Sequence, residues 1–255
     1  IGIVGCGFVG SQVYNKAKAL GLTIVKNDPP RFKIGDKTCN ATLDEALACD
    51  IVTLHVPLIK DGEYKTLHLI DEQKLLKLKP NAIFINASRG NVVDNEALSE
   101  FLEKRPDVKV WLDVFEGEPQ MNCKKLLSQV DGATAHIAGY SYESKRRANV
   151  MLANTLAHVL KLEEPKAYVM PKPEIESTTL GKVENLDLDL IRRLVFSVYD
   201  VRRDSLMFKN CFKDAKSFDA MRSNYRERRE LSSLHLLNVE DKFKEQLSLL
   251  GFSVD

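Results

Sequence analysis

The first 140 residues alternate between short apolar runs and segments with helical periodicity. The apolar, β-branched runs predict strands, namely IGIV (1–4), LTIVKNDPP (22–30), DIVTLHVP (50–57), NAIFINAS (81–88), DVKVWLDV (107–114) and GATAHIAG (132–139). Val13, Ala17 and Leu20 give the first helix, and TLDEALAC (42–49), DEQKLLKLK (71–79), DNEALSEFLEK (94–104) and CKKLLSQV (123–130) give the later ones. Apolar strands that alternate with helices indicate α/β architecture, with a doubly wound parallel sheet covered on both faces.

The rest of the chain predicts a long helix, a linker and a second, smaller domain. Apolar residues recur at helical spacing between Ser141 and Lys161, whereas residues 163–178 are charged and rich in proline, which is typical of a linker. Residues 179–255 mix helical patterns (187–204 and 217–230) with short apolar runs, which indicates a small α+β module. The predicted boundaries are therefore 1–140, 141–162, 163–178 and 179–255.

The first strand leads into the glycine pattern Gly5-x-Gly7-x-x-Gly10. Strand, tight turn and helix in this order are typical of a Rossmann dinucleotide-binding unit, whose helix N-terminus faces the pyrophosphate. Asp28 ends the second strand, where a carboxylate can accept hydrogen bonds from the ribose hydroxyls and favours NAD over NADP, although Arg31 nearby weakens that exclusion. The alternative is that Asp28 is a plain turn residue. The candidate cofactor contacts are Gly5, Gly7, Phe8, Val9, Gly10 and Asp28.

Composition narrows the classes of protein and partner. The chain has 255 residues, 44% of them hydrophobic and 29% charged, and its net charge of +1 gives no case for nucleic acid or a membrane as a main partner. A basic cluster at Arg222, Arg226, Arg228 and Arg229 is interleaved with glutamates, which favours a solvated or intersubunit helix face. Five scattered cysteines indicate reduced thiols and a cytoplasmic protein. Because the chain opens on a strand without methionine, we expect that an N-terminal part is missing.

Three reactive side chains follow three successive predicted strands. Arg89, Glu118 and His136 taken singly fit a surface cation, a turn residue and a strand-ending histidine. Together, at the carboxyl edge of one sheet, they suit hydride transfer from a 2-hydroxy acid. His136 would take the hydroxyl proton, Glu118 would orient its ring, and Arg89 would hold the substrate carboxylate.

The motifs GCGFVG, INASRGNVVD, LDVFEGEP and HIAGY resemble the NAD-dependent D-2-hydroxyacid dehydrogenases over residues 1–162. The resemblance implies that Arg89, Glu118 and His136 are catalytic and that Asp113 and Gly139 contact NAD. It also implies that Val56 lines the cofactor pocket, at a position where a hydroxyl residue is expected. The N-terminal part of the family's substrate domain is absent from this sequence.

A narrower resemblance extends into the tail, through NDPPR, PLIKDGEYKTLHLID, HIAGYSYESK, RRLVFSVYDVRRD and FDAMRSNYRERRE. This narrower resemblance is to family members that oxidise a phosphorylated 2-hydroxy acid. It implies that Tyr140 faces the substrate and that the tail forms a homodimer interface. A substrate phosphate also needs a cation, and the sequence does not choose among Lys145, Arg146, Arg202 and Arg203.

Two alternatives remain, which are a dehydrogenase for another 2-hydroxy acid, such as phosphoglycerate or glycerate, and a non-catalytic NAD-sensing interaction protein. His55 sits at a strand end near the cofactor edge. No metal site is predicted, because His68, His158 and His235 have no neighbouring ligands at metal-binding spacing.

Overall fold

The computed structural model describes residues 1–163 and 169–255, which form two compact units. The first unit contains residues 1–137 and 201–224, and the second contains residues 138–200 and 225–255. Residues 164–168 of the predicted linker lie outside the described residues.

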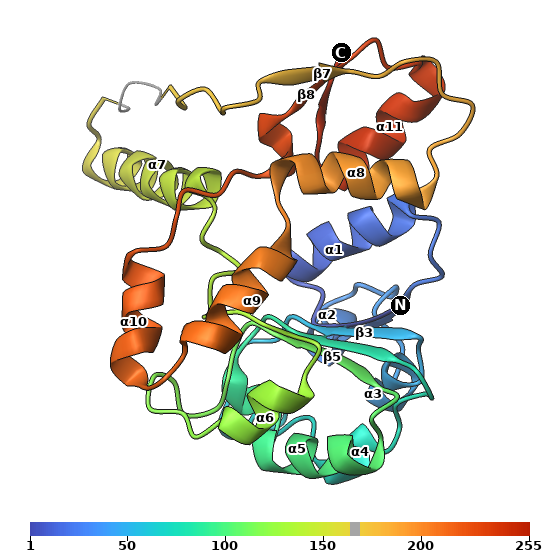
Figure 1. Cartoon of the computed structure of the whole chain (residues 1–255), viewed down its shortest axis with the longest axis vertical. Coiled ribbons are helices and arrows are strands. Elements are labelled where there is room, and N and C mark those ends of the chain that lie inside the picture. Colours follow the sequence, from blue (N-terminus) through green and yellow to red (C-terminus); the bar gives the residue numbers. More distant parts are fainter. Residues whose placement is uncertain (164–168) are drawn as a thin grey trace. The chain divides into compact units, whose positions relative to one another are not determined.

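A six-stranded parallel sheet organises the first unit, in the order β2-β1-β3-β4-β5-β6 (Figure 1). Its strands are β1 (Gly2–Val4), β2 (Val25–Asn27), β3 (Ile51–Leu54), β4 (Ile83–Asn86), β5 (Lys109–Leu112) and β6 (Gly132–Ala133). All six predicted strands are present, and the order reverses between β1 and β3. The predicted α/β fold with a doubly wound sheet is confirmed.

Helices cover both faces of this sheet, as predicted (Figure 1). One face carries α3 (Leu43–Leu47), α4 (Glu72–Leu75), α5 (Asn95–Lys104) and α6 (Lys124–Gln129), each of which contacts the next. The opposite face carries α1 (Phe8–Ala19). A short helix that the sequence did not predict, α2 (Pro29–Lys33), starts directly after Asp28, whose side chain caps it by accepting from the Arg31 N–H.

The predicted domain boundaries differ from the structure in the tail. Helices α9 (Val201–Cys211) and α10 (Ala215–Ser223) belong to the first unit, not to a continuous domain of residues 179–255. The reason is apolar packing, because Phe208 and Phe218 are almost fully buried and the Phe208 ring centroid lies 5.7 Å from that of Phe115. The Ala133 N–H also donates to Ser205 Oγ at 3.0 Å, so α9 is tied to β6.

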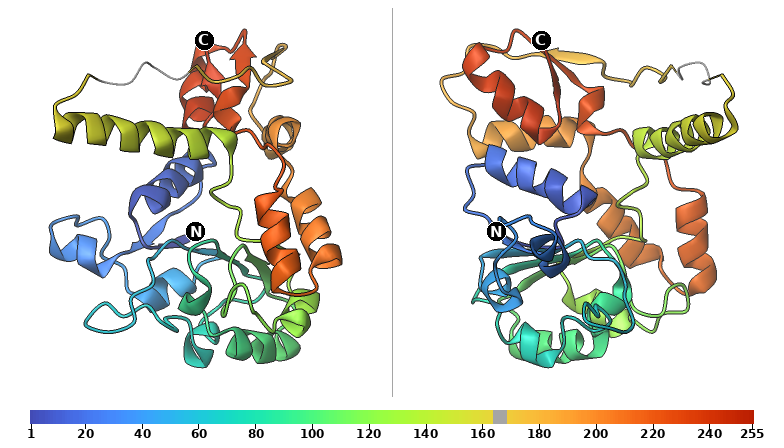
Figure 2. Two further views of the ribbon diagram at one scale, coloured as in Figure 1. Left: turned by 90° about the vertical axis from the view of Figure 1, so that its left-hand side faces the viewer. Right: turned by 180° about the vertical axis from the view of Figure 1, so that it is seen from behind.

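The second unit joins a parallel three-stranded sheet, in the order β7-β8-β9, to three longer helices (Figure 2). Its elements are α7 (Tyr142–Leu160), β7 (Ser177–Thr179), α8 (Leu188–Val198), β8 (His235–Leu237), α11 (Asp241–Leu250) and β9 (Ser253–Val254). Two short 3-10 helices, Gly90–Val92 in the first unit and Leu231–Ser233 in the second, complete the described elements.

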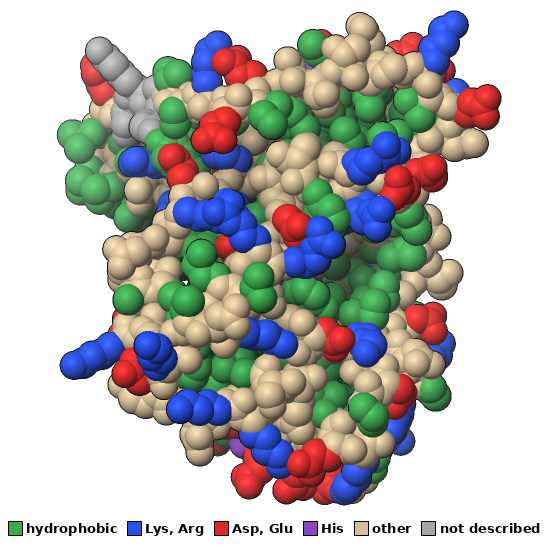
Figure 3. Space-filling view, viewed as in Figure 1, with side chains coloured by type: hydrophobic (Ala, Val, Ile, Leu, Met, Phe, Trp, Pro, Cys, Tyr) green, Lys and Arg blue, Asp and Glu red, His purple; other side chains and the backbone are tan. Residues whose placement is uncertain are grey.

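The long helix α7 is exposed along much of its length. Its far end carries solvent-exposed apolar side chains, which gather on the surface in Figure 3, among them Met151, Leu152, Leu156, Val159 and Leu160. Among residues 1–163 and 169–255, no helix is both long and apolar enough to cross a membrane.

Two glycines of the first turn allow a test of how this fold is held. A Cβ on Gly10 would lie 2.0 Å from the Gly5 carbonyl oxygen, whereas a Cβ on Gly7 would meet no protein atom within 4 Å. Gly10→Ala should therefore push α1 off β1 and lower the free energy of unfolding by about 1–3 kcal/mol. Gly7→Ala is the matched control and should unfold in urea like the wild type. Equal stability of both variants would contradict this account of the turn.

Candidate active site

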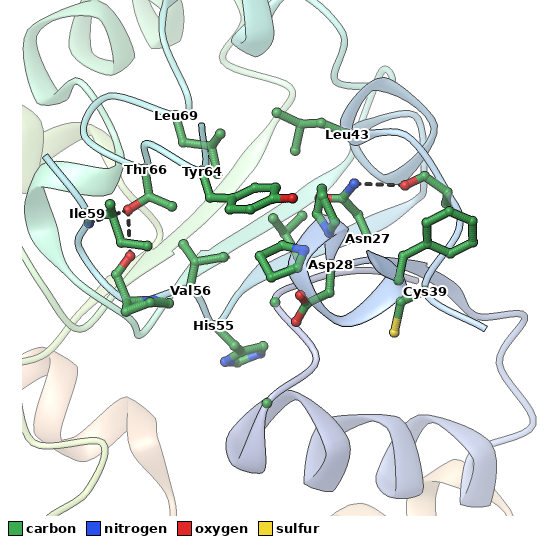
Figure 4. Close-up of a pocket in the computed structure, with 18 of the residues that line it drawn as sticks. Asn27, Asp28, Cys39, Leu43, His55, Val56, Ile59, Tyr64, Thr66 and Leu69 are labelled. Atoms are coloured by element: carbon green, nitrogen blue, oxygen red, sulfur yellow. Dashed lines mark hydrogen bonds between the residues drawn. The ribbon is translucent and has the colours of Figure 1, made fainter. Parts of the chain in front are cut away.

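A cavity of about 500 Å³ opens at the carboxyl ends of β1, β2 and β3 (Figure 4). This is the point where the strand order reverses, which is where open parallel sheets bind ligands. Its wall is mainly apolar, and Leu43, Val56, Ile59 and Leu69 contribute to it. The size and lining suit a flat, partly apolar group such as an adenine ring.

The glycine turn beside this cavity has the features of a phosphate cradle. Gly5 has a φ of +88°, which L side chains rarely adopt, and the space that a Cβ on Gly7 would fill is open. Among the residues that the structure describes, no side chain caps the N-terminus of α1, so its first N–H groups can bind a ligand. Phe8 is 98% exposed and Val9 is also exposed. The residues present therefore fit a dinucleotide pyrophosphate.

Asp28 lies at the cavity with its carboxylate held toward the glycine turn. One oxygen accepts from the Cys6 N–H at 2.7 Å and the other from the Arg31 N–H at 3.0 Å. A carboxylate has about four lone-pair sites, so these bonds leave acceptor capacity for ribose hydroxyls. The Arg31 Nε lies 3.4 Å from Asp36 Oδ2, so this arginine already has a carboxylate partner.

His55 forms part of the cavity wall as a neutral ring. Its Nε2 is 3.0 Å from Thr53 Oγ1, while its buried Nδ1 has no hydrogen-bond partner among the described residues. Burial lowers the pKa of this imidazole to about 4, so it is uncharged at neutral pH. The sequence placed His55 near the cofactor edge but gave no sign of the Thr53 contact.

His136 and Glu118 are brought together as the sequence predicted. His136 Nδ1 is 2.7 Å from Glu118 Oε2, and Glu118 Oε1 accepts from the Phe115 N–H at 2.6 Å. Because an ionised carboxylate only accepts, this contact places the ring proton on Nδ1 and leaves the Nε2 lone pair for another proton. The His136 side chain is 33% exposed, so solvent or a ligand can reach it.

Asp113 holds the backbone around this histidine. Its Oδ1 accepts from Thr134 Oγ1 at 2.5 Å and from the Ile137 N–H at 2.8 Å, and its carbonyl accepts from the His136 N–H at 2.7 Å. His136 has a φ of +54°, an uncommon backbone conformation for a histidine. These bonds on both sides of the residue maintain that conformation.

Arg89 lies in the turn after β4, the strand next to β5. Asn86 organises the turn, since its Nδ2 donates to the Arg89 carbonyl at 3.0 Å and its Oδ1 accepts from the Ser88 N–H at 3.0 Å. The Arg89 Nη1 donates to the Ser88 carbonyl at 2.7 Å. A Cβ on Gly90 would lie 1.9 Å from the Phe115 carbonyl oxygen, so the turns carrying Arg89 and Glu118 are in close backbone contact.

Sequence reasoning missed a hydrogen-bonded group that links these turns. His68 Nε2 lies 2.6 Å from Glu116 Oε1, which also accepts from Asn91 Nδ2 at 3.2 Å, and the other Glu116 oxygen accepts from the Asn95 N–H at 3.4 Å. Glu116 therefore connects two regions. One is the loop of His68, which leads away from the cavity, and the other is formed by the turns that carry Arg89 and Glu118. His68 and Glu116 are 48 residues apart in the sequence, so no local pattern could reveal their contact.

The remaining predicted residues are divided between the two units. Gly139 and Tyr140 belong to the second unit, where Tyr140 contacts the Tyr225 ring and Lys145 Nζ lies 4.2 Å from the Tyr140 ring centroid. Lys145 and Arg146 lie on α7, whereas Arg202 and Arg203 lie on α9 in the first unit. Among the described residues, no cluster of three or more potential ligands could hold a metal ion.

The fold and these groups define an NAD-dependent dehydrogenase with a dinucleotide-binding unit. Residues 1–138 match the family model described as D-isomer specific 2-hydroxyacid dehydrogenase, NAD binding domain. The chain belongs to this family, which confirms the predicted cofactor and class of enzyme. Residues 169–251 match a second model, described as a domain of unknown function (DUF3410).

Relatives named erythronate-4-phosphate dehydrogenase match nearly the whole chain. The proteins of Escherichia coli and Cronobacter sakazakii are 43% and 44% identical, over 99% of this chain and 67% of their own length. Among solved structures, D-lactate dehydrogenase from Aquifex aeolicus, complexed with NAD and lactic acid, matches with a TM-score of 0.52 and 29% identity, covering 62% of this chain and 52% of that one. The Lactobacillus jensenii enzyme with NAD⁺ has a TM-score of 0.53 and 28% identity, covering 64% and 53%.

The lowered pKa of His55 gives a test by pH. Its folded-state pKa of about 4 lies below the unfolded value of 6.5, so the unfolded chain binds the proton first as pH falls. Stability should therefore decline between pH 6.5 and 4, with this group contributing roughly 3 kcal/mol at most. His55→Phe removes the titrating ring, and its free energy of unfolding should fall less over the same interval. Urea unfolding at several pH values checks this, and equal slopes for the two proteins would contradict it.

Proposed function

We propose that this chain carries out the NAD-dependent oxidation of 4-phospho-D-erythronate to (R)-3-hydroxy-2-oxo-4-phosphooxybutanoate, a step of pyridoxal 5′-phosphate (vitamin B6) biosynthesis. The observation that carries the proposal is the extent of the match to the named relatives. It includes both units and the tail, at 99% of the chain, whereas the D-lactate dehydrogenases cover 62–64%. A dehydrogenase for phosphoglycerate or glycerate is the nearest alternative within the family.

His136 is the base in this proposal. The Glu118 contact holds the Nδ1 proton, so Nε2 takes the proton of the substrate C2 hydroxyl. Glu118 then stabilises the imidazolium that forms, at the same 2.7 Å contact. Bound NAD⁺ supplies the acceptor for the hydride that leaves C2.

Arg89 holds the substrate carboxylate and polarises the C2 oxygen. Its side chain is exposed and uses Nη1 on the Ser88 carbonyl, and a guanidinium has five N–H donors in a planar fork. This geometry fixes the reacting carbon and stabilises the charge that develops on the oxygen.

The other predicted contacts belong to the same proposal. Tyr140 faces the substrate, and a cation among Lys145, Arg146, Arg202 and Arg203 takes its phosphate. Cofactor contacts come from Gly5, Gly7, Phe8, Val9, Gly10, Asp28, Val56, Asp113 and Gly139. The fit of the Asp28 carboxylate and the open glycine turn supports the first six of these.

Substrate choice is tested with the full chain encoded by the source gene. NADH formation is followed with 4-phospho-D-erythronate, D-3-phosphoglycerate and D-glycerate, and a parallel series contains a 2-oxo acid that can reoxidise a cofactor which stays bound. The highest kcat/KM is expected for phosphoerythronate. Preference for phosphoglycerate would change the substrate but keep the chemistry, and inactivity with all three would favour an NAD-sensing role.

The same assay tests the residue roles. His136→Asn should lower kcat by about 10²-fold or more, which leaves almost no turnover, while the Kd for NAD stays near that of the wild type. Arg89→Lys should also lose most activity, because a point charge cannot reproduce a bidentate clamp. Loss of NAD affinity in the first variant, or near-normal kcat/KM in the second, would remove that residue from its assigned role.

We also propose that the protein is a cytoplasmic homodimer that assembles through its C-terminal domain. The exposed Leu188 and Phe196 on α8 supply apolar surface for such an interface. Burial, with Cys39 and Asp28, raises the pKa of the Cys6 thiol to about 12, so this thiol stays protonated and unreactive.

Assembly is best measured on the intact chain, because deleting residues 179–255 would also remove α9 and α10 from the first unit. Sedimentation should give the mass of a dimer, and Leu188→Glu with Phe196→Glu should shift it toward the monomer. The exposed Leu76, in the first unit, is the control position for a Leu→Glu change. A monomer at all concentrations would refute the proposed dimer.

A further inference from the structure

A short piece of the tail lies along the segment that follows the catalytic histidine. Residues 225–230, within the region matched by the model of unknown function, contact residues 138–143, and both segments belong to the second unit. Residues 138–143 start two positions after His136, and two residues of chain span at most about 7 Å. Whatever fixes the Ala138 backbone therefore acts on the segment that carries Gly139 and Tyr140.

Arg228 is the central contact between the two segments. Its side chain is 8% exposed, and its Nη2 donates to the Ala138 carbonyl at 2.8 Å. The guanidinium also lies over two aromatic rings, 4.6 Å from the centroid of Tyr199 and 5.8 Å from that of Tyr225. The Arg228 carbonyl accepts from the Tyr142 N–H at 2.8 Å, so both ends of this residue hold the segment.

A buried carboxylate makes the second contact. Glu143 is 5% exposed and accepts from Arg229 Nε at 2.6 Å and from the Glu230 N–H at 2.9 Å. Ser141 Oγ is 2.7 Å from Glu230 Oε1. A buried carboxylate is costly to leave without partners, so these bonds hold residues 225–230 in one position along the segment.

The contacts between residues 225–230 and residues 138–143 also include Tyr140. The Tyr225 ring meets the Tyr140 ring edge-on, with centroids 6.1 Å apart. Arg228 stacks on the same Tyr225 ring, so the guanidinium, Tyr225 and Tyr140 form one packed series. The placement of Tyr140 within the second unit thus depends on these tail residues.

We propose that residues 225–230 position Tyr140 for its contact with the substrate and that Arg228 is the main positioning residue. The inference rests on the proposed function, in which His136 and Tyr140 act on the substrate. Arg228 acts through the Ala138 carbonyl and the Tyr225 ring, so its loss lets residues 138–143 move. NAD affinity should change less than kcat, because the dinucleotide cavity is lined by residues 4–69 of the first unit and, of the proposed cofactor contacts, Gly139 alone lies in residues 138–143.

Arg228→Lys in the full chain encoded by the source gene is the decisive variant. It keeps the charge but loses the planar group that stacks and donates at the same time. We expect kcat to fall about tenfold or more, since small misplacements at a reacting centre cost rate, while the Kd for NAD changes less than roughly threefold, because most cofactor contacts lie elsewhere. Arg193→Lys, an exposed arginine on α8 paired with Asp189, is the matched control and should leave kcat unchanged.

Hydrogen–deuterium exchange separates a positioning role from general destabilisation. Residues 137–144 should exchange faster in Arg228→Lys than in the control, with the cavity residues unchanged. If Arg228→Lys does not fold, Glu143→Gln replaces it with the same expectations, because it weakens the second contact only. Added guanidinium ion should restore part of the kcat of Arg228→Ala.

Unchanged kcat in folded Arg228→Lys and Glu143→Gln would overturn the proposal, even if exchange increases, because the contacts would then serve only the second unit. A wild type that is inactive on phosphoerythronate would overturn the proposed function instead. In that case, faster exchange confined to residues 137–144 would still support the positioning of this segment by residues 225–230, and unchanged exchange would overturn it.

Discussion

The site depends first on the side chain of Asp113. Asp113 directly follows β5 and is 7% exposed, and its carboxylate bonds to Thr134 and Ile137, which lie on the two sides of His136. His136 has a left-handed backbone conformation, which a non-glycine residue keeps only where its surroundings hold it. With that backbone fixed, the imidazole reaches Glu118, whose own turn follows β5 directly. A single strand end therefore places both His136 and the carboxylate that contacts its ring.

Other strands of the same sheet position the remaining residues of the candidate site, on the β1 side and on the β4 side. Toward β1, the order reversal opens the dinucleotide cavity, where Asp28 and the glycine turn lie together. Toward β4, the close backbone approach of Gly90 to Phe115 brings in the turn of Arg89. Glu116 then connects these regions, because it accepts from Asn91 and Asn95 and lies against His68. The candidate site residues come from separate turns, but hydrogen bonds between the turns make them one assembly.

Local patterns explain which of these features the sequence could predict. Strand composition, helical spacing and the Gly5-x-Gly7-x-x-Gly10 motif act over short distances, so the sheet, its order of elements and the pairing of Glu118 with His136 were all accessible. Contacts between distant residues were not. The pattern of 187–204 suggested one helix, but the chain breaks between α8 and α9. Phe208 is buried against Phe115 of the first unit, and no spacing within the tail could show that preference.

The basic run at the end of the tail shows how burial changes the meaning of a sequence pattern. Interleaved arginines and glutamates favoured a solvated or intersubunit helix face, but α10 ends at Ser223 and residues 225–230 follow outside any helix. Arg228 is buried between aromatic rings, and Arg229 pairs with the buried Glu143. Buried ion pairs add little net stability, because desolvation offsets much of the attraction, but they strongly disfavour every arrangement that leaves one charge unpaired. Their effect here is to select one register between two segments of the second unit, one of which carries Tyr140.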